Sequence, residues 1–177
     1  MLYQPRPVLQ TGENIGVKHI IADVVHGALA CALPVLAAMV VAINRLLTVW
    51  ESSVRATHLF LSDSEIKKIK EYVPQALIGI AHLMIAEDDR GCPVAFMGIE
   101  DGTLEMLFIS PEERGKGLGK RLLQYGIKTY AVERVAVNEQ NPQAKGFYEH
   151  LGFQVYKRTD LDEQGNPYPL LYMSLNI

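Results

Sequence analysis

A glycine-rich loop, Arg114–Lys120, joins an apolar run to an apolar-periodic segment, and this join constrains the fold more than any other feature. The run Leu104–Ile109 is typical of a buried strand, and a helix is expected over residues 117–130. Glycines at alternate positions allow sharp bends and the close approach of a ligand, while the first N–H groups of a helix have no intrahelical acceptor. Together with the basic side chains of the loop, the pattern predicts a cradle for a pyrophosphate group.

The spacing of these glycines excludes two well-known nucleotide-binding loops. The P-loop pattern needs a glycine five residues before Gly119, where this chain has Arg114. It also needs Ser or Thr after Lys120, where this chain has Arg121. The dinucleotide fingerprint would place its third glycine at position 120. A phosphate-binding loop of another kind and a glycine-rich turn without a ligand are the two interpretations left.

Length and composition narrow the class of protein. The 177 residues are enough for one domain with a sizeable core. The net charge of −3, the pI of about 5.9 and the lack of a long basic run argue against a nucleic-acid partner. Cys31 and Cys92 form neither a CxxC pair nor a metal-ligand cluster with the five histidines, so no metal site and no disulfide are predicted. Free thiols are typical of a reducing compartment, and we expect a cytoplasmic protein.

Residues 1–43 differ from the remainder because they carry only four charged side chains. Their last part, Gly27–Ile43, is an uncharged, alanine-rich run that would span about 25 Å as a helix, short of the roughly 30 Å of a bilayer core. This segment is a buried or docked helical extension, a membrane anchor, or a stretch outside the working fold. We therefore divide the chain into an atypical apolar extension, 1–43, and a domain, 44–177.

Along the chain, the domain is expected to contain two or more helices, then a set of hairpins, and then alternating strands and helices. The change after Pro111 favours a parallel crossover in a mixed α/β sheet that has helices on both faces. Helices are expected over residues 36–53, 63–72 (ending before Pro74), 117–130 and 142–150, and strands over 82–87, 93–99, 104–109, 134–137, 154–161 and 169–175.

A second motif lies downstream of the glycine loop, with Asn141, Ala144 and Tyr148 at its key positions and Gly152-Phe153 at its end. With this motif and Arg114-x-x-Gly-x-Gly in order, the chain resembles the GNAT superfamily of acetyl-CoA-dependent N-acetyltransferases from about residue 45 to its end. The stretches 53–58, 137–141 and 167–171 look like those of small bacterial members whose acceptors are undefined. The resemblance implies a GNAT-like, mostly antiparallel mixed sheet with a parallel central strand pair.

The resemblance also implies direct acetyl transfer from acetyl-CoA, as co-substrate, to a primary amine of a small molecule or a peptide. No metal takes part, and the protein is expected to be a monomer or a homodimer. In the family the glycine loop wraps the coenzyme A pyrophosphate, and the pantetheine arm pairs with the backbone of the preceding strand. The implied coenzyme A-binding residues are Leu107, Phe108, Ile109, Arg114, Gly115, Lys116, Gly117, Leu118, Gly119, Lys120, Asn141, Ala144 and Tyr148.

Two residues of this motif have a structural as well as a functional interpretation. Tyr148 is the candidate general acid, since a phenol of pKa about 10 stays protonated at neutral pH and can donate to a leaving thiolate whose thiol pKa is near 8.5. It could instead pack with Phe147 and Phe153. Asn141 would bond the coenzyme A arm, cap the helix before Pro142, or do both.

The acceptor side is less well defined. Glu105 interrupts an apolar strand, where an unpaired carboxylate is costly to bury, so it is a candidate general base or acceptor-binding group. An ion pair or a strand-end position is the alternative, and water could take the proton instead. His58, expected in the loop between the first two helices, forms a candidate recognition cluster with Trp50, Arg55 and Phe60, although each alone could be structural.

The chain departs from the family pattern at two places. Relatives begin with a strand directly before the first helix, a role that only Val17–Asp23 could fill here, and Ala136 stands where nearer relatives are often polar. These departures motivate a second hypothesis, a coenzyme A-binding regulatory or membrane-associated interaction protein with decayed catalysis.

Overall fold

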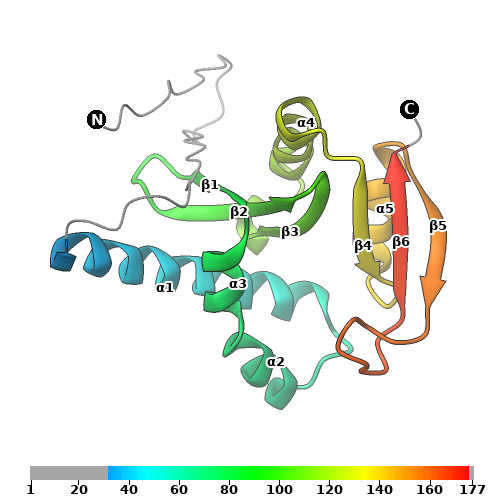
Figure 1. The fold of residues 1–177 in the computed structure, drawn as a ribbon, viewed down its shortest axis with the longest axis horizontal. Coiled ribbons are helices and arrows are strands. Elements are labelled where there is room, and N and C mark those ends of the chain that lie inside the picture. Colours follow the sequence, from blue (N-terminus) through cyan, green and yellow to red (C-terminus); the bar gives the residue numbers. More distant parts are fainter. Residues whose placement is uncertain (1–31, 176–177) are drawn as a thin grey trace.

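The computed structural model describes the backbone of residues 32–175 and the side chains of residues 39–175 (Figure 1). The expected strand Val17–Asp23 and most of the extension 1–43 lie outside the described residues. The elements are α1 (Ala32–Thr57), α2 (Asp63–Lys70), α3 (Val73–Gly79), β1 (His82–Glu87), β2 (Pro93–Glu100), β3 (Thr103–Ile109), the 3₁₀ turn η1 (Pro111–Glu113), α4 (Leu118–Tyr130), β4 (Arg134–Asn138), α5 (Pro142–His150), β5 (Phe153–Thr159) and β6 (Leu170–Leu175).

Within this part of the chain the strands form one six-stranded sheet in the order β1-β2-β3-β4-β6-β5. Only the central pair, β3 and β4, is parallel, and every other neighbouring pair is antiparallel. The mixed, mostly antiparallel sheet with a parallel central pair is therefore confirmed. The parallel register holds for only two residue pairs, Thr103 with Arg134 and Leu104 with Val135. Beyond them the two strands separate, and the halves of the sheet diverge (Figure 1).

Strand β3 carries a β-bulge that the sequence pattern did not predict. Gly98 pairs with Met106 and Ile99 pairs with Leu104, so Glu105 is the additional residue. A bulge re-aims the side chains that follow it. Leu104 consequently packs on the same side of the sheet as Leu107, whereas Met106 packs on the opposite side.

Helices cover both faces of the sheet, as predicted. Helices α4 and α5 enclose one core with residues such as Met97, Leu123 and Phe153, which are at most 1% exposed. Helices α1, α2 and α3 enclose the other, with Trp50 and Phe96 at its centre. Burial of each large apolar side chain stabilises the fold by about 1.5–3 kcal/mol. The two cores fix α1 and α5 on either side of the diverging strands.

Two helices differ from the sequence prediction. Helix α1 ends at Thr57, one turn beyond the expected end at Ser53, and the Thr57 hydroxyl donates to the Ser53 carbonyl at 2.8 Å. Helix α3 was missed because Pro74 was interpreted only as a helix terminator, whereas it occupies the first turn of α3, where its missing N–H costs nothing. No described helix has both the length and the apolar character needed to cross a membrane.

A helix cap and a hairpin turn that the sequence predicted are both present in the structure. Ser62 and Glu65 form the expected capping box at the start of α2, and each side chain bonds the backbone N–H of the other residue. Asp101 and Gly102 have φ of 45° and 70°, so they form the tight hairpin turn predicted between β2 and β3.

Candidate active site

The glycine loop leaves η1 and enters α4 through two residues in the left-handed region. Gly115 has φ 75° and Gly117, the N-cap of α4, has φ 80°. A Cβ atom built on either residue would meet nothing within 4 Å. Glycine is therefore required at both positions by backbone conformation, and the space above the loop is open to a ligand.

Gly119 has a different role. A Cβ atom here would lie 2.9 Å from Cδ1 of Ile109 and 3.4 Å from Cζ of Phe147. Its hydrogen lets the first turn of α4 pack directly against β3 and α5. The three glycines thus combine a bent, open loop with a tightly packed helix start.

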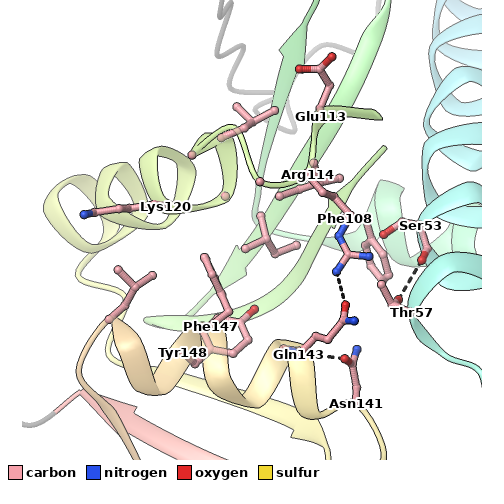
Figure 2. A pocket seen from close by; sticks show the side chains of 18 of the residues that line it. Ser53, Thr57, Phe108, Glu113, Arg114, Lys120, Asn141, Gln143, Phe147 and Tyr148 are labelled. Carbon is pink, nitrogen blue, oxygen red and sulfur yellow. Dashed lines mark hydrogen bonds between the residues drawn. The ribbon is translucent and has the colours of Figure 1, made fainter. Parts of the chain in front are cut away.

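A cavity of about 380 Å³ extends from this loop between β3, α5 and the C-terminal end of α1 (Figure 2). It is lined by Ser53, Thr57, His58, Leu107, Phe108, Ile109, Glu113, Arg114, Gly115, Gly117, Leu118, Gly119, Lys120, Asn141, Gln143, Ala144, Phe147, Tyr148, His150 and Leu151. We call it the donor cavity. Of the coenzyme A-binding residues predicted from the sequence, only Lys116 does not line it, and Lys116 pairs with Glu113 at 3.0 Å.

A second, smaller cavity of about 120 Å³ lies between β3 and β4, where the two strands separate. Leu104, Glu105, Met106, Val135, Ala136, Val137 and Asn138 line it alone, and six further residues line both cavities: His58, Leu107, Phe108, Asn141, Ala144 and Tyr148. We call it the acceptor cavity. The two cavities therefore meet at the divergence of β3 and β4.

Tyr148 lies at this meeting point with its ring packed between two other aromatic rings. The ring is 5.0 Å from that of Phe147 and 5.8 Å from that of Phe153, both in edge-to-face geometry. The residue is only 7% exposed, and burial raises the pKa of its phenol above the ordinary value. The hydroxyl group is thus protonated at neutral pH, and packing and cavity lining coexist.

Asn141 combines a capping contact with a position on both cavities. Its Oδ1 accepts a hydrogen bond from the backbone N–H of Ala144 at 3.1 Å, and Pro142 follows in the first turn of α5. The side chain is buried at 7% exposure. The capping interpretation is confirmed, and its amide group lies where it can also contact a ligand.

A hydrogen bond crosses the donor cavity. Arg114, in the glycine loop, donates from Nη2 to Oε1 of Gln143 on α5 at 2.8 Å, and Figure 2 shows this contact between the two walls. No sequence motif joins these residues, which are 29 positions apart. Gln143 entered the prediction only as an unspecified position between Asn141 and Ala144.

Glu105 is exposed and faces only the acceptor cavity. Partial burial raises the pKa of its carboxyl, and the carboxylates of Glu163 and Glu100 raise it further. Glu105 is the additional residue of the β3 bulge. It is the one carboxylate among the described residues that line the acceptor cavity.

The predicted recognition cluster is brought only partly into the site. His58 lines both cavities, and its Nδ1 lies 2.7 Å from the Thr57 hydroxyl. Trp50 is buried against Phe108, Arg55 pairs with Glu51 and Asp63, and Phe60 contacts the rings of His58 and Tyr168. These three residues line neither cavity.

Sequence reasoning missed several residues of the donor cavity. Ser53 and Thr57 both line it, Thr57 from the turn by which α1 extends beyond its expected end, and the two form a hydrogen bond on the cavity wall (Figure 2). Phe147 had been interpreted only as a packing residue. The small side chains on the last turns of α1 were the one signal that this helix end faces a ligand.

The donor cavity suits a long ligand with a pyrophosphate group. The N-terminus of α4 has no acidic residue in its first turn, and Arg114 and Lys120 add positive charge. The space over Gly115 and Gly117 is open, and apolar groups such as Leu107 and Ala144 line the path from there toward Tyr148. Within the described residues, no three His, Cys, Asp or Glu side chains are grouped so that they could hold a metal ion.

Residues 79–155 match the sequence model of the acetyltransferase (GNAT) domain. The peptidyl-lysine N-acetyltransferase YjaB of Salmonella typhimurium is 41% identical over 128 residues, which are 72% of this chain and 88% of that protein. The solution structure of apo YjaB from Escherichia coli has a TM-score of 0.66 at 39% identity and covers 72% of this chain and 86% of that one.

A more distant solved structure shares the fold. The PaiA N-acetyltransferase from Thermoplasma acidophilum, crystallised in complex with coenzyme A, has a TM-score of 0.60 at 22% identity over 76% of this chain and 94% of that chain. The matched segment 79–155 contains β3, the glycine loop and α5, which form most of the donor cavity. With 41% identity over most of both chains, this chain belongs to the GNAT family of N-acetyltransferases, which use acetyl-CoA as the acetyl donor.

Proposed function

We propose that this chain transfers the acetyl group of acetyl-CoA directly to the side-chain amine of lysine in a peptide or protein. The observation that carries the proposal is the meeting of two cavities at Tyr148, one lined by the glycine loop and one lined by the diverging strands. Donor and acceptor would approach from opposite sides, so both substrates are bound at once. This geometry favours a ternary complex over a covalent enzyme intermediate.

Each part of coenzyme A would contact a different part of the donor cavity. The backbone N–H groups at the start of α4, with Arg114 and Lys120, would hold the pyrophosphate. The backbone of Leu107–Ile109 would pair with the pantetheine arm, and a main-chain N–H group in this segment would stabilise the oxyanion. Asn141 and Ala144 would contact the arm from α5.

Tyr148 is proposed as the general acid that protonates the leaving thiolate. Burial keeps its hydroxyl group protonated, and its position between the cavities is where the thioester must lie for attack. A phenol is a weaker acid than a thiol in water. Proton donation from Tyr148 to the developing thiolate is therefore favourable only when the thiolate is poorly solvated. The aromatic rings packed around Tyr148, which is 7% exposed, would limit the solvation of that thiolate.

The acceptor cavity suits a lysine side chain. Its walls include the apolar groups of Leu104, Met106, Val135 and Val137, which would pack along a four-carbon stem, and Glu105 would attract the ammonium group. Ala136 leaves this wall without an additional polar contact. The relatives named peptidyl-lysine N-acetyltransferase support the same acceptor class.

We also propose that residues 44–177 are the working acetyltransferase domain and that 1–43 are an extension to it. Helix α1 is continuous across this boundary, but its character changes. Val40 and Val41 are about half exposed, whereas Leu46 and Trp50 are buried at 2% and 4%. The buried part of α1 completes the core under β2 and β3.

The test is an acceptor panel with acetyl-CoA, monitored by thiol release and by mass spectrometry of the acceptor. We expect lysine-containing peptides to be acetylated on the side-chain amine, and a matched peptide with arginine in place of lysine to give no acceptor-dependent release. The Tyr148→Phe variant is the enzyme control. Turnover of a polyamine or an aminoglycoside without turnover of any lysine peptide would overturn the proposed acceptor class.

A further inference from the structure

We propose that His58 accepts the proton of the attacking amine, and that Thr57 positions its ring for this step. This inference rests on the direct acetyl transfer proposed above and adds the proton acceptor to it. His58 follows the last residue of α1 and is one of the six residues that line both the donor and the acceptor cavity. It therefore lies where the new carbon–nitrogen bond forms, whereas Glu105 lines the acceptor cavity alone.

A chain of hydrogen bonds determines which nitrogen of His58 carries the proton. The Thr57 hydroxyl donates its single proton to the Ser53 carbonyl at 2.8 Å. The same oxygen lies 2.7 Å from Nδ1 of His58 and, with its proton already used, can only accept. Nδ1 therefore carries the ring hydrogen, and Nε2 presents a lone pair that can take a proton.

The surroundings keep the ring neutral. Burial lowers the pKa of His58, and a hydrogen bond to the backbone of Val54 offsets only part of this effect. The titratable and charged groups that share its cavities are Glu105 from β3, Glu113 and Arg114 from the loop, Lys120 from α4, and Tyr148 and His150 from α5. Glu113 and Arg114 already bond Lys116 and Gln143. At neutral pH the ring is therefore neutral and can accept a proton.

The timing of the transfer follows from the acidity of the amine. Taking a proton from a free lysine ammonium, of pKa about 10.4, is uphill by about four pKa units for an imidazole. The nitrogen becomes far more acidic once it has attacked the carbonyl carbon. We therefore place the transfer to His58 after the attack, when a weak base that is neutral at neutral pH suffices.

The step balances as follows. The ammonium group of the acceptor first loses one proton to solvent. The neutral amine then uses its lone pair to form the C–N bond, and the carbonyl π electrons move to oxygen. The N–H proton passes to Nε2 of His58. The oxygen electrons then re-form the carbonyl, the C–S bond breaks, and the sulfur takes the bonding pair and the proton of Tyr148. The products are the amide and the free thiol, and solvent carries one proton from His58 back to Tyr148.

The experiment compares wild-type protein with His58→Ala, Thr57→Val and the control Tyr156→Phe, at an exposed residue of β5 that lines neither cavity, using a lysine peptide and n-butylamine as acceptors. We expect His58→Ala to lower kcat by roughly 10²–10⁴-fold while coenzyme A affinity by calorimetry changes by less than about twofold. Added imidazole should restore part of the rate in His58→Ala, but none in Tyr148→Phe. Thr57→Val should lower kcat by a smaller factor.

The pH profile separates a proton acceptor from a structural residue. In wild-type protein and in Tyr156→Phe, kcat/KM should fall more steeply at acid pH, because protonation of His58 adds to protonation of the amine, and this additional steepening of the acid limb should be lost in His58→Ala. A His58→Ala variant with normal kcat, or with an unchanged acid limb, would overturn the role of His58 and leave the proposed function intact. Turnover of n-butylamine but of no lysine peptide would overturn the proposed acceptor class and still test His58. Failure of wild-type protein with both amines would overturn both proposals.

Discussion

Arg114 and Gln143 join the glycine loop to α5 by a hydrogen bond of 2.8 Å across the donor cavity. The guanidinium group of Arg114 lines the donor cavity, yet part of its donor capacity is used by a neutral amide. A phosphate oxygen is the stronger acceptor for a guanidinium group. Binding of coenzyme A should therefore break this contact and turn Arg114 toward the phosphates.

Substitutions of Arg114 and Gln143 should have different effects on the affinity for coenzyme A. Arg114→Ala removes a charged hydrogen bond worth about 1.5–3 kcal/mol, so the Kd should rise by about 10- to 100-fold. Gln143→Ala removes only the competing acceptor, so the Kd should stay the same or fall. Isothermal calorimetry with coenzyme A measures both. Equal weakening in the two variants would mean that the Arg114–Gln143 contact persists in the complex.

Gly119 and Gly146 form a matched pair for testing the packing of the site. At Gly119 a new Cβ atom would lie 2.9 Å from Ile109, and we expect Gly119→Ala to lower the free energy of unfolding by about 1–3 kcal/mol. Gly146 lies inside α5, where a Cβ atom would meet nothing within 4 Å. There Gly146→Ala should raise the free energy by about 0.5–1 kcal/mol. Urea unfolding of both variants checks the two signs, and destabilisation by Gly146→Ala would contradict the open space at that position.

Removal of the Tyr148 hydroxyl group should separate chemistry from binding. The ring of Tyr148→Phe keeps its contacts with Phe147 and Phe153, so the fold and coenzyme A affinity should be retained. Loss of a general acid lowers kcat by about 10²–10⁴-fold. Thiol release under saturating acetyl-CoA measures kcat, and thermal shift with coenzyme A measures binding. A kcat within threefold of wild type would remove Tyr148 from the reaction.

The elements that sequence reasoning predicted are those with a local physical cause. The turn at Asp101 and Gly102 needs two residues with positive φ, and the sequence Asp-Gly supplies them. The strand–loop–helix order around Arg114–Lys120 likewise follows from apolar periodicity and glycine spacing alone. The residues that line the donor cavity could be predicted because most of them belong to one continuous stretch and one helix start.

The acceptor side depends on contacts between distant segments, which no local pattern records. The bulge at Glu105 arises from the register of β2 against β3, and it decides which cavity this carboxylate faces. The position of His58 on both cavities depends on the last turn of α1, which Thr57 and Ser53 extend through a hydrogen bond. Sequence reasoning assigned Trp50 to the acceptor site, whereas the structure buries it in a core. A large aromatic residue serves equally well in either place, so its type alone does not distinguish them.

The last prediction concerns the contact between Tyr168 and Glu65, which ties the β5–β6 loop to the start of α2. The Tyr168 hydroxyl group donates to Oε1 of Glu65, and the Tyr168 ring packs on Phe60, next to His58. Hydrogen bonds from Ser62, followed by that from Tyr168, lower the pKa of Glu65 to about 2. The contact therefore favours the ionised carboxylate and links the β5–β6 loop to the start of α2.

A carboxylate with a lowered pKa stabilises the fold above its ordinary pKa and loses this contribution as the pH falls toward its folded value. Tyr168→Phe keeps the ring but removes the hydrogen bond, so its Tm at pH 7 should lie a few degrees below that of wild type. The difference should narrow as the pH falls from about 4.5 toward 2, where Glu65 is protonated. Tyr156→Phe, at a residue 57% exposed on β5, is the control and should follow wild type at every pH. Thermal unfolding across this pH range measures the difference, and a constant gap would show that Tyr168 acts through its packing on Phe60 and not through the charge of Glu65.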